Sequence, residues 1–272
     1  MKLSANSERD SIKLLQLTDT HLFSTTDGCL LSVNTLDSFH AVVQEVINQE
    51  VEYDAVLATG DISQDHTAKS YQRFEQGIAS LEKKCLWLPG NHDFKPNMSS
   101  VLPSEQISAD EHVLAGDHWQ IIQLDSQVTG VPHGRLSEQQ LALLKDKLEE
   151  YPDRYTLILL HHHPVLVGSA WLDQHTLYDA DNFWNIIVKH TNVKATLCGH
   201  VHQEFDERHF GVRVMATPST CVQFKPDSQD FALDAKEPGW RTLELKSDGT
   251  IETRVHRLKG SDFLPDFNAG GY

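Results

Sequence analysis

The chain has 272 residues, which is enough for one large domain with a substantial core or for two small ones. Hydrophobic residues make up 39% and charged residues 23%, as in ordinary globular proteins, and no apolar run approaches the roughly 20 residues that a membrane-spanning helix needs. The net charge of -16 argues against nucleic acid as a partner, because an acidic surface repels phosphate backbones, and it means that a phosphate-handling site would need local positive charge such as bound metal ions.

The first half of the chain is predicted to alternate strands and helices. Residues 1–11 are polar and contain no apolar signal core, so we expect no export. Apolar runs and helical spacing predict the order strand 12–17, helix 34–49, strand 53–58, helix 67–81 and strand 85–88. The first helix is expected to bury an apolar stripe formed by Leu36, Phe39, Val43 and Ile47. This alternation predicts right-handed crossovers between parallel strands, so that the three strand ends meet at one edge of a sheet.

The second half is predicted to contain more hairpins. Residues 94–110 are expected to be irregular, with Pro96 and Pro103 among them. Turn residues between apolar runs predict hairpins of 112–115 with 119–124, 204–208 with 212–216, and 240–245 with 250–257. Further strands are predicted at 156–160 and 195–198, and further helices from Ser137 and at 183–190.

No repeat, low-complexity tract or linker divides the chain, so we expect a single domain over residues 1–272. The predicted fold class is α/β (α+β), with two mixed sheets packed face to face and helices outside. The C-terminal hairpin and tail, 238–272, would complete this domain, with the tail lying extended.

Four cysteines, Cys29, Cys85, Cys198 and Cys221, form no C-x-x-C motif. We expect reduced thiols that pack as small apolar groups, in keeping with a cytoplasmic protein. Histidine is frequent, with 16 residues, and several of them follow predicted strands. Clustered histidines indicate a metal site or acid–base chemistry.

Five predicted strands end in turns that carry metal-binding side chains. The turns are Asp19-Thr20-His21, Gly60-Asp61, Gly90-Asn91-His92-Asp93, His161-His162-His163 and Gly199-His200-Val201-His202. Any one of them could be an ordinary capping or surface turn. Together they favour a metal centre, because the candidate donors all come directly after apolar runs: Asp19, His21, Asp61, Asn91, His92, His161, His200 and His202.

The donor set consists of carboxylate, imidazole and amide groups and contains no thiolate. It therefore excludes a structural zinc site of the cysteine type and suits Fe, Mn or Zn. These candidate ligands exceed the need of one ion, so we expect two divalent ions that share a carboxylate. Such a pair can clamp a phosphoryl group and activate a bridging hydroxide for in-line attack.

The five motifs, in this order between residues 19 and 202, resemble those of the calcineurin-like metallophosphoesterases. The stretches 17–23, 160–164, 216–226 and 238–243 are similar to the bacterial class III cyclic-AMP phosphodiesterases, and this similarity covers nearly the whole chain. The resemblance implies a four-layer α/β/β/α sandwich and hydrolysis of 3',5'-cyclic AMP to 5'-AMP.

The resemblance also implies a role for each motif residue. Asp19, His21 and His202 would bind a first metal ion, Asn91, His161 and His200 a second, and Asp61 would bridge the two. The family uses Fe, Mn or Zn, and we expect Fe(II) first. His92 would be the catalytic residue that protonates the leaving oxygen. The expected substrate contacts are His21, Asp61, Asn91, His92, His161 and His202.

Two alternatives stay open from the sequence. One is another diesterase on the same scaffold, either a glycerophosphodiesterase or an enzyme of broad specificity. A protein phosphatase is disfavoured because the stretch 60–65 lacks the Arg that follows this motif in that family. The other alternative is a metal-binding regulatory protein without turnover. The partner expected is a small cyclic nucleotide, with neither nucleic acid nor a membrane, and no oligomeric state is predicted.

Four residues near the motifs have two interpretations each. His162 and His163 would support the metal ligands from behind or would simply pack. Asp93 would orient His92 or His21, or it would cap a turn. Trp171 could stack on adenine, but packing is the favoured interpretation.

Overall fold

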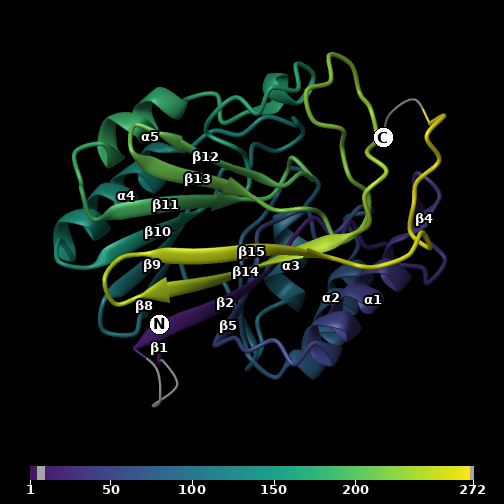
Figure 1. Ribbon diagram of the computed structural model, residues 1–272, viewed down its shortest axis with the longest axis horizontal. Helices are drawn as coiled ribbons and strands as arrows, with labels where there is room; N and C mark the ends of the chain where they lie inside the picture. The colour runs from purple at the N-terminus through teal and green to yellow at the C-terminus, as the bar shows by residue number, and fades with distance from the viewer. Residues whose placement is uncertain (5–9, 270–272) are drawn as a thin grey trace.

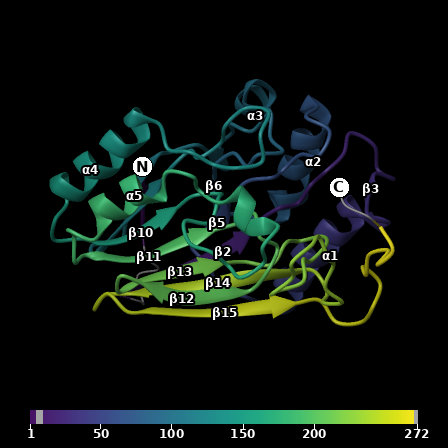
Figure 2. The same cartoon turned by 90° about the horizontal axis from the view of Figure 1, so that it is seen from above.

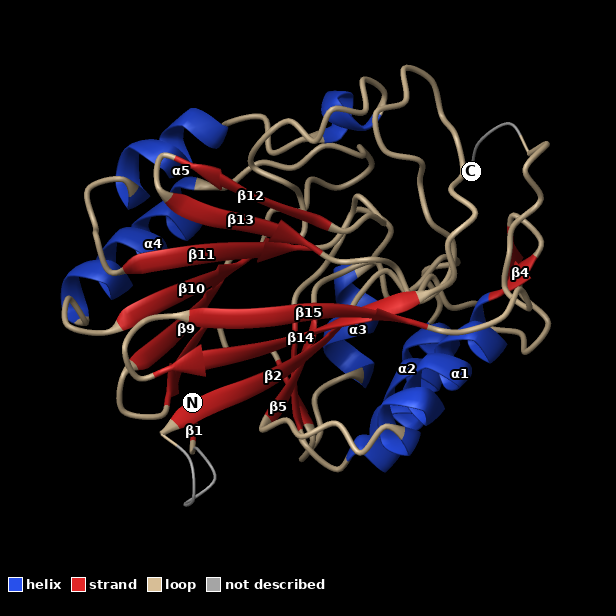
Figure 3. Cartoon of the chain, in the orientation of Figure 1, coloured by secondary structure: helices blue, strands red, loops and turns tan. Residues whose placement is uncertain are grey.

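Two β-sheets packed face to face form the centre of the computed structural model, and helices cover their outer faces (Figure 1). The structure describes residues 1–4 and 10–269. The view from above separates the helices from the sheets (Figure 2), and colouring by secondary structure shows strands through the middle and helices on either side (Figure 3). The predicted fold class is confirmed.

The six-stranded sheet contains the first predicted strands. Its order is β15 (Ile251–Arg257), β14 (Gly239–Lys246), β2 (Ser11–Leu17), β5 (Ala55–Ala58), β6 (Lys84–Trp87) and β7 (Ile107–Ser108). Strands β2, β5 and β6 run parallel, as the strand–helix alternation predicted. Strand β7 lies in the segment 94–110 that was predicted to be irregular, and it pairs in parallel with β6. The C-terminal hairpin β14–β15 joins this sheet through antiparallel pairing of β14 with β2.

Apart from the N-terminal strand β1, the seven-stranded sheet is built from the middle of the chain. Its order is β1 (Lys2–Leu3), β8 (His112–Ala115), β9 (Trp119–Gln123), β10 (Tyr155–Leu159), β11 (Val193–Cys198), β13 (Val212–Ala216) and β12 (Phe205–His209). Strands β9, β10, β11 and β13 are parallel neighbours, while β8–β9 and β12–β13 are the predicted hairpins. A separate two-stranded sheet pairs β3 (Cys29–Leu30) with β4 (Val33–Asn34).

The helices begin at polar caps or at proline. They are α1 (Thr35–Asn48), α2 (Ala68–Ile78), α3 (Lys95–Val101), α4 (Glu138–Glu150) and α5 (Ala180–Ile187), with short 3-10 turns η1 (Ala79–Leu81) and η2 (Leu172–His175). Asn34, Thr67 and Ser137 accept backbone N–H groups at the starts of α1, α2 and α4. Among the described residues, no helix has both the length and the apolar character to cross a membrane.

Three apolar layers account for the four-layer arrangement. One lies between the two sheets and includes Leu57, Leu157 and Leu197. A second joins the six-stranded sheet to α1 and α2, where Phe39 and Phe74 stack with ring centroids 5.6 Å apart. The third joins the seven-stranded sheet to α4 and α5. The central strands of each sheet are therefore buried on both faces, which explains why they read as continuous apolar runs, while the edge strands β12 and β15 are largely exposed or half-buried.

Two local expectations were wrong. Helix α3 lies in the segment predicted to be irregular, and Pro96 falls in its first turn, where the missing N–H leaves no helical hydrogen bond unmade. On α1, Ile47 is 39% exposed, and Val42 and Val46 are buried beside Phe39 instead. Both possible stripes have helical spacing, so the direction of packing against α2 and the sheet selects one of them.

Candidate metal centre

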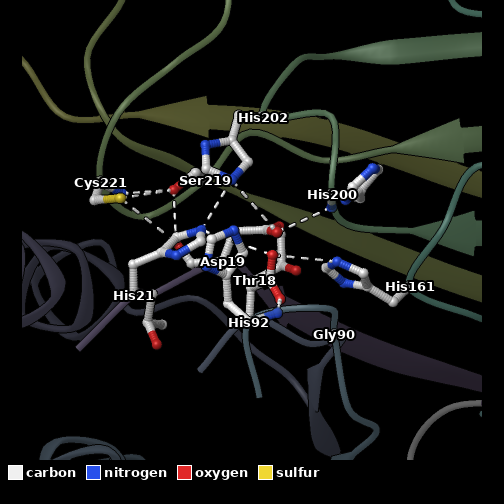
Figure 4. Close-up of polar contacts among 12 residues, drawn as sticks. Thr18, Asp19, His21, Gly90, His92, His161, His200, His202, Ser219 and Cys221 are labelled. Carbon is white, nitrogen blue, oxygen red and sulfur yellow. Dashed lines mark hydrogen bonds and ion pairs between the residues drawn. The ribbon is translucent and has the colours of Figure 1, made fainter. Parts of the chain in front are cut away.

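The five ligand-bearing turns converge at one place between the two sheets. Those after β2, β5 and β6 come from the six-stranded sheet, and those after β10 and β11 come from the seven-stranded sheet. Figure 4 shows the side chains of Asp19, His21, His92, His161 and His202 gathered together, while the His200 ring stands at the edge of this group. The structure therefore brings together all the side chains that the sequence analysis assigned to the site: Asp19, His21, Asp61, Asn91, His92, His161, His200 and His202.

Several of these residues adopt the left-handed backbone conformation, with φ between 46° and 70°: Asp19, His21, Asp61, His200 and His202. Non-glycine residues pay for this conformation, and it concentrates at functional sites. Backbone hydrogen bonds hold the turns in place, with Asp19 N donating to Gly60 O at 3.1 Å and His21 N donating to Asp61 O at 2.9 Å. The strain is thus maintained by contacts between motifs.

Two glycines permit the close approach of neighbouring turns. A Cβ atom at Gly90 would lie 2.7 Å from His161 Cε1 and would overlap the Asp61 carboxylate. Gly60 has φ +101°, and a Cβ there would collide with the His161 ring. The glycines of both motifs therefore make room for the side chains that other motifs supply.

The first predicted metal position contains Asp19, His21 and His202, which each offer a ligand atom within 4.8 Å of the others. His21 Nε2 lies 3.1 Å from His202 Nε2, and His202 Nε2 lies 3.5 Å from Asp19 Oδ1. Asp19 Oδ2 is buried without a hydrogen-bond partner. The opposite ring nitrogens are anchored, because His21 Nδ1 contacts Gln64 Oε1 at 2.7 Å and His202 Nδ1 contacts Val222 O at 2.9 Å.

Asp61 lies between the two predicted metal positions. It belongs to one candidate group with Asp19 and His161 and to another with His21 and His92. His161 Nε2 lies 3.3 Å from Asp61 Oδ2 and 3.1 Å from Asn91 Oδ1. This placement is the one that a bridging carboxylate requires.

His200 occupies a less expected position. Its backbone N–H donates to Asp19 Oδ1 at 2.9 Å, while its Nε2 is buried without a partner. The three-residue metal group to which it belongs contains His161 and His162. His162 is therefore a neighbour of the second predicted metal position. The sequence alone had left open whether His162 lies beside the metal ligands or simply packs.

Burial controls the charge of these imidazoles. It lowers the pKa of His21 to about 3 and, with help from His162, holds the pKa of His200 well below the ordinary value. Neutral imidazole is the form that binds metal. For His161, burial acts in the same direction but Asp61 outweighs it and raises the pKa to about 9, so a metal ion would displace a proton there.

Asp61 stays ionised even though it is buried. Burial alone would raise its pKa, but the neighbouring His161 and His92 hold it well below the ordinary value. His92 is partly exposed, and its backbone N–H donates to Asp61 Oδ1 at 2.8 Å. Its ring meets His21 edge-on at 5.0 Å. Burial lowers the pKa of His92, while Asp61 opposes this change.

These residues fit a pair of divalent ions. The donors are carboxylate and imidazole, and Asp19 Oδ2 and His200 Nε2 are buried with no other partner. The nearby Cys221 belongs to none of the candidate metal groups among the described residues, and burial raises the pKa of its thiol to about 12. All four thiols are free, as expected from the sequence.

The residues with two interpretations now have defined contacts. The Asp93 carboxylate accepts backbone N–H groups from Ile62, Ser63 and Gly90, so it caps and joins turns. Trp171 packs edge-on against Phe224 at 4.9 Å and Phe231 at 5.1 Å. The packing interpretation of Trp171 is therefore the one that its contacts support.

Some residues that anchor the site carry no recognisable motif. Thr59 O contacts His161 Nδ1 at 2.8 Å, and Ser219 Oγ donates to Asp19 O at 2.7 Å. Backbone carbonyls and a distant serine leave no pattern in the sequence. Sequence analysis could have identified Gln64 as a residue that supports the site, because it lies three residues after Asp61 in the same turn and contacts His21.

Comparison with known proteins places this geometry in a family. The family model described as calcineurin-like phosphoesterase matches residues 12–204. The chain is 65% identical over 263 residues to a Vibrio vulnificus protein named 3',5'-cyclic adenosine monophosphate phosphodiesterase CpdA, covering 97% of this chain and 96% of that protein. It is 52% identical over 261 residues to the Escherichia coli (strain K12) protein of the same name, covering 96% and 95%.

A solved structure has the same fold. A dimetal phosphatase from Danio rerio superimposes with a TM-score of 0.61 at 14% sequence identity, covering 91% of this chain and 99% of that one. At this identity the likeness concerns the fold alone. The match over 12–204 includes all five ligand-bearing turns that meet between the sheets, and the chain belongs to the calcineurin-like phosphoesterase family.

Proposed function

We propose that this protein hydrolyses 3',5'-cyclic AMP to 5'-AMP with the help of two divalent metal ions per chain. The observation that carries the proposal is the 65% identity to a protein named as a cyclic AMP phosphodiesterase, over nearly the full length of both chains. The converging carboxylate and histidine side chains supply the kind of site that this reaction needs.

The proposed ligands follow the two sides of the centre. Asp19, His21 and His202, which form one candidate group, would hold one ion, and Asp61, which belongs to two groups, would be shared by both ions. On the other side, Asn91, His161 and His200 would hold the second ion. Fe(II) is the first candidate for both positions, with Mn(II) and Zn(II) as alternatives. When bound, two such ions supply Lewis acidity and neutralise phosphate charge, which offsets the net charge of -16 on the chain.

His92 is the proposed general acid. Its backbone is fixed to Asp61 Oδ1, and its partly exposed ring stands beside His21, so it can face a phosphodiester bound at the centre. As the bond between phosphorus and the 3' oxygen breaks, the imidazolium donates its proton to that oxygen. The oxygen of water becomes the new phosphate oxygen, and the product is 5'-AMP.

The substrate is tested by comparing kcat/KM for three diesters under reducing conditions with Fe(II) or Mn(II). The diesters are 3',5'-cyclic AMP, glycerophosphodiesters and bis(p-nitrophenyl) phosphate. A strong preference for cyclic AMP that yields 5'-AMP and not 3'-AMP is the expected result. Faster turnover of the other diesters would overturn the cyclic-nucleotide assignment and favour a diesterase of broad specificity.

The role of His92 is tested with His92→Ala. We expect kcat to fall by about 10²–10⁴-fold, the usual contribution of a general acid, while both metal ions stay bound. His40→Ala is the control, because His40 is an exposed histidine on α1. Loss of a metal ion from His92→Ala would make His92 a ligand and would remove it from the proton-transfer step.

A further inference from the structure

Most of the proposed ligand histidines have a polar contact at the ring nitrogen that does not face the metal position. For three of them, the Nδ1 atom is held by an oxygen outside the ligand set. The contacts are His21 with Gln64 Oε1 at 2.7 Å, His161 with Thr59 O at 2.8 Å and His202 with Val222 O at 2.9 Å. Metal-bound imidazoles nearly always use their second nitrogen in this way, because the contact fixes the tautomer and the orientation of the ring.

His200 is the exception to this pattern. Its Nε2 is buried and has no hydrogen-bond partner, although its backbone N–H is bound to Asp19. In Figure 4 the His200 ring stands at the edge of the group and is directed away from Asp19. Its ring centroid lies 4.8 Å from that of His162 and 5.0 Å from that of His161. His162 therefore has the ring centroid nearest to that of His200 among the observed ring contacts, ahead of His161 and of His163 at 5.5 Å.

The His162 ring, which lies beside the His200 ring, has an Nε2 atom that is available as a hydrogen-bond acceptor. Its side chain is fully buried, its Nδ1 lies 2.7 Å from Ser126 Oγ, and its Nε2 has no partner. The Pro132 carbonyl, which can only accept, also faces this ring. Since Nε2 is unpartnered, the N–H that these contacts bind is the one on Nδ1, which leaves a lone pair on Nε2.

The position of the His162 ring is also restrained. A Cβ atom at Gly134 would lie 2.5 Å from His162 Cγ, so the backbone at Gly134 packs directly on the ring. The backbone N–H of His162 donates to the same Ser126 Oγ at 3.3 Å. One ring nitrogen from each of His161, His162 and His200 lies within 4.8 Å of the others. His162 is thus held in place beside His200.

We propose that His162 is a positioning residue that accepts the Nε2–H of His200, so that His200 presents its Nδ1 to the second metal ion. The Ser126–His162 contact is present in the structure, and the proposed His162–His200 hydrogen bond would form between two Nε2 atoms that are both buried and unpartnered. The proposal rests on the proposed function, because it takes His200 to be a metal ligand. It gives the fourth histidine the same support that the other three already have.

The first test measures metal affinity and not activity. Zn(II) is titrated into the metal-free protein in competition with a chelator, for the parent, His162→Phe, His162→Gln and the control His163→Phe. His163 is an equally buried neighbour whose ring stacks on His200 at 5.5 Å, but it belongs to no candidate metal group. We expect about 10–100-fold weaker binding of one of the two Zn(II) ions in His162→Phe, with partial recovery in His162→Gln. Equal losses in His162→Phe and His163→Phe would mean that packing alone matters and would overturn the proposal.

The second test observes the tautomer. Long-range ¹H–¹⁵N NMR spectra of the Zn(II)-loaded protein report the state of each ring nitrogen, and His162→Gln assigns the resonances. We expect His162 to carry its proton on Nδ1, with an unprotonated and metal-free Nε2. A proton on Nε2, or zinc bound to it, would refute the proposed acceptor role.

A third variant separates this proposal from the ligand assignment. His200→Ala is expected to lose one of the two Zn(II) ions. If His200→Ala keeps both ions, the assignment of His200 as a ligand fails and the positioning role fails with it. If His200→Ala loses one ion while His162→Phe binds both ions as tightly as the parent, only the role of His162 is wrong.

Discussion

The Asp93 carboxylate is the strongest link between two of the metal-site turns. It is 6% exposed and accepts the backbone N–H groups of Ile62 and Ser63 at 3.1 Å, that of Gly90 at 2.9 Å and the hydroxyl of Tyr71 at 3.1 Å. Ile62 and Ser63 follow the bridging candidate of the second motif, and Gly90 opens the third. Asp93 therefore joins the turn after β5 to the turn after β6.

Asp93→Ala removes this acceptor and leaves four buried donors without a partner. A buried donor left without a partner costs about 1–3 kcal/mol. Because the four contacts share one carboxylate, their losses do not add fully. We expect a loss of about 3–6 kcal/mol in the free energy of unfolding, which is a large share of the roughly 5–15 kcal/mol of a typical domain.

The measurement is urea unfolding followed by circular dichroism in the presence of EDTA, so that metal binding does not contribute. Burial, with a smaller effect of Asp61, raises the pKa of Asp93 to about 7, so ionising the folded carboxyl costs stability and the loss in Asp93→Ala should decrease as the pH rises toward that value. All variants are therefore compared at one pH below it. Tyr71→Phe is the matched control. It removes one donor to Asp93 and the acceptor for Phe94 N, and it should cost about 1–2 kcal/mol.

A loss below about 1 kcal/mol for Asp93→Ala would refute this reasoning, because one unsatisfied buried donor already costs that much. The reasoning would also be refuted if Asp93→Ala left the metal-free stability unchanged but lowered the metal affinity. That outcome would mean that Asp93 acts on the metal ligands and not on the turns.

Three further predictions follow from burial and close approach. Gly90→Ala should lower the metal content at equilibrium dialysis, because the added methyl group displaces the Asp61 carboxylate, and full retention of two ions per chain would contradict this. Only the exposed Cys29 should react with a thiol reagent in the native protein, because the other three thiols are buried and have raised pKa values. All four thiols should react in urea. A second fast-reacting thiol in the native protein would disprove the assigned burial. Trp171→Leu should lower the melting temperature through lost packing on Phe224 while leaving the ratio of KM values for cyclic AMP and bis(p-nitrophenyl) phosphate unchanged, and a selective rise in KM for cyclic AMP would instead indicate adenine stacking.

The elements that sequence reasoning located well are those with strong local patterns. The buried strands β2, β5 and β10 are short apolar runs that end in a polar turn, and the start of α4 is marked by Ser137, whose side chain accepts the Gln140 N–H. Helix α3 was missed because its seven residues contain Pro96 near the start and show no long apolar stripe. A local pattern of this length does not distinguish a short helix from a loop.

The choice between two buried stripes on α1 shows a different limit. Leu36, Phe39 and Val43 were predicted to be buried and are, but Ile47 is exposed and Val46 is buried. Both valine and isoleucine positions satisfy helical spacing, so the outcome depends on where α2 and the sheet lie. That information is absent from the segment itself.

The amino-acid sequence by itself determined the five turns and the chemistry of their donors, because apolar runs, glycines and ligand types are local properties. Tertiary structure alone decided which donors meet. His21 and His202 approach to 3.1 Å across 181 residues of chain only because the two sheets pack face to face with these turns at one end. The same packing places His162 beside His200, and it sets the burial that keeps most of these imidazoles uncharged.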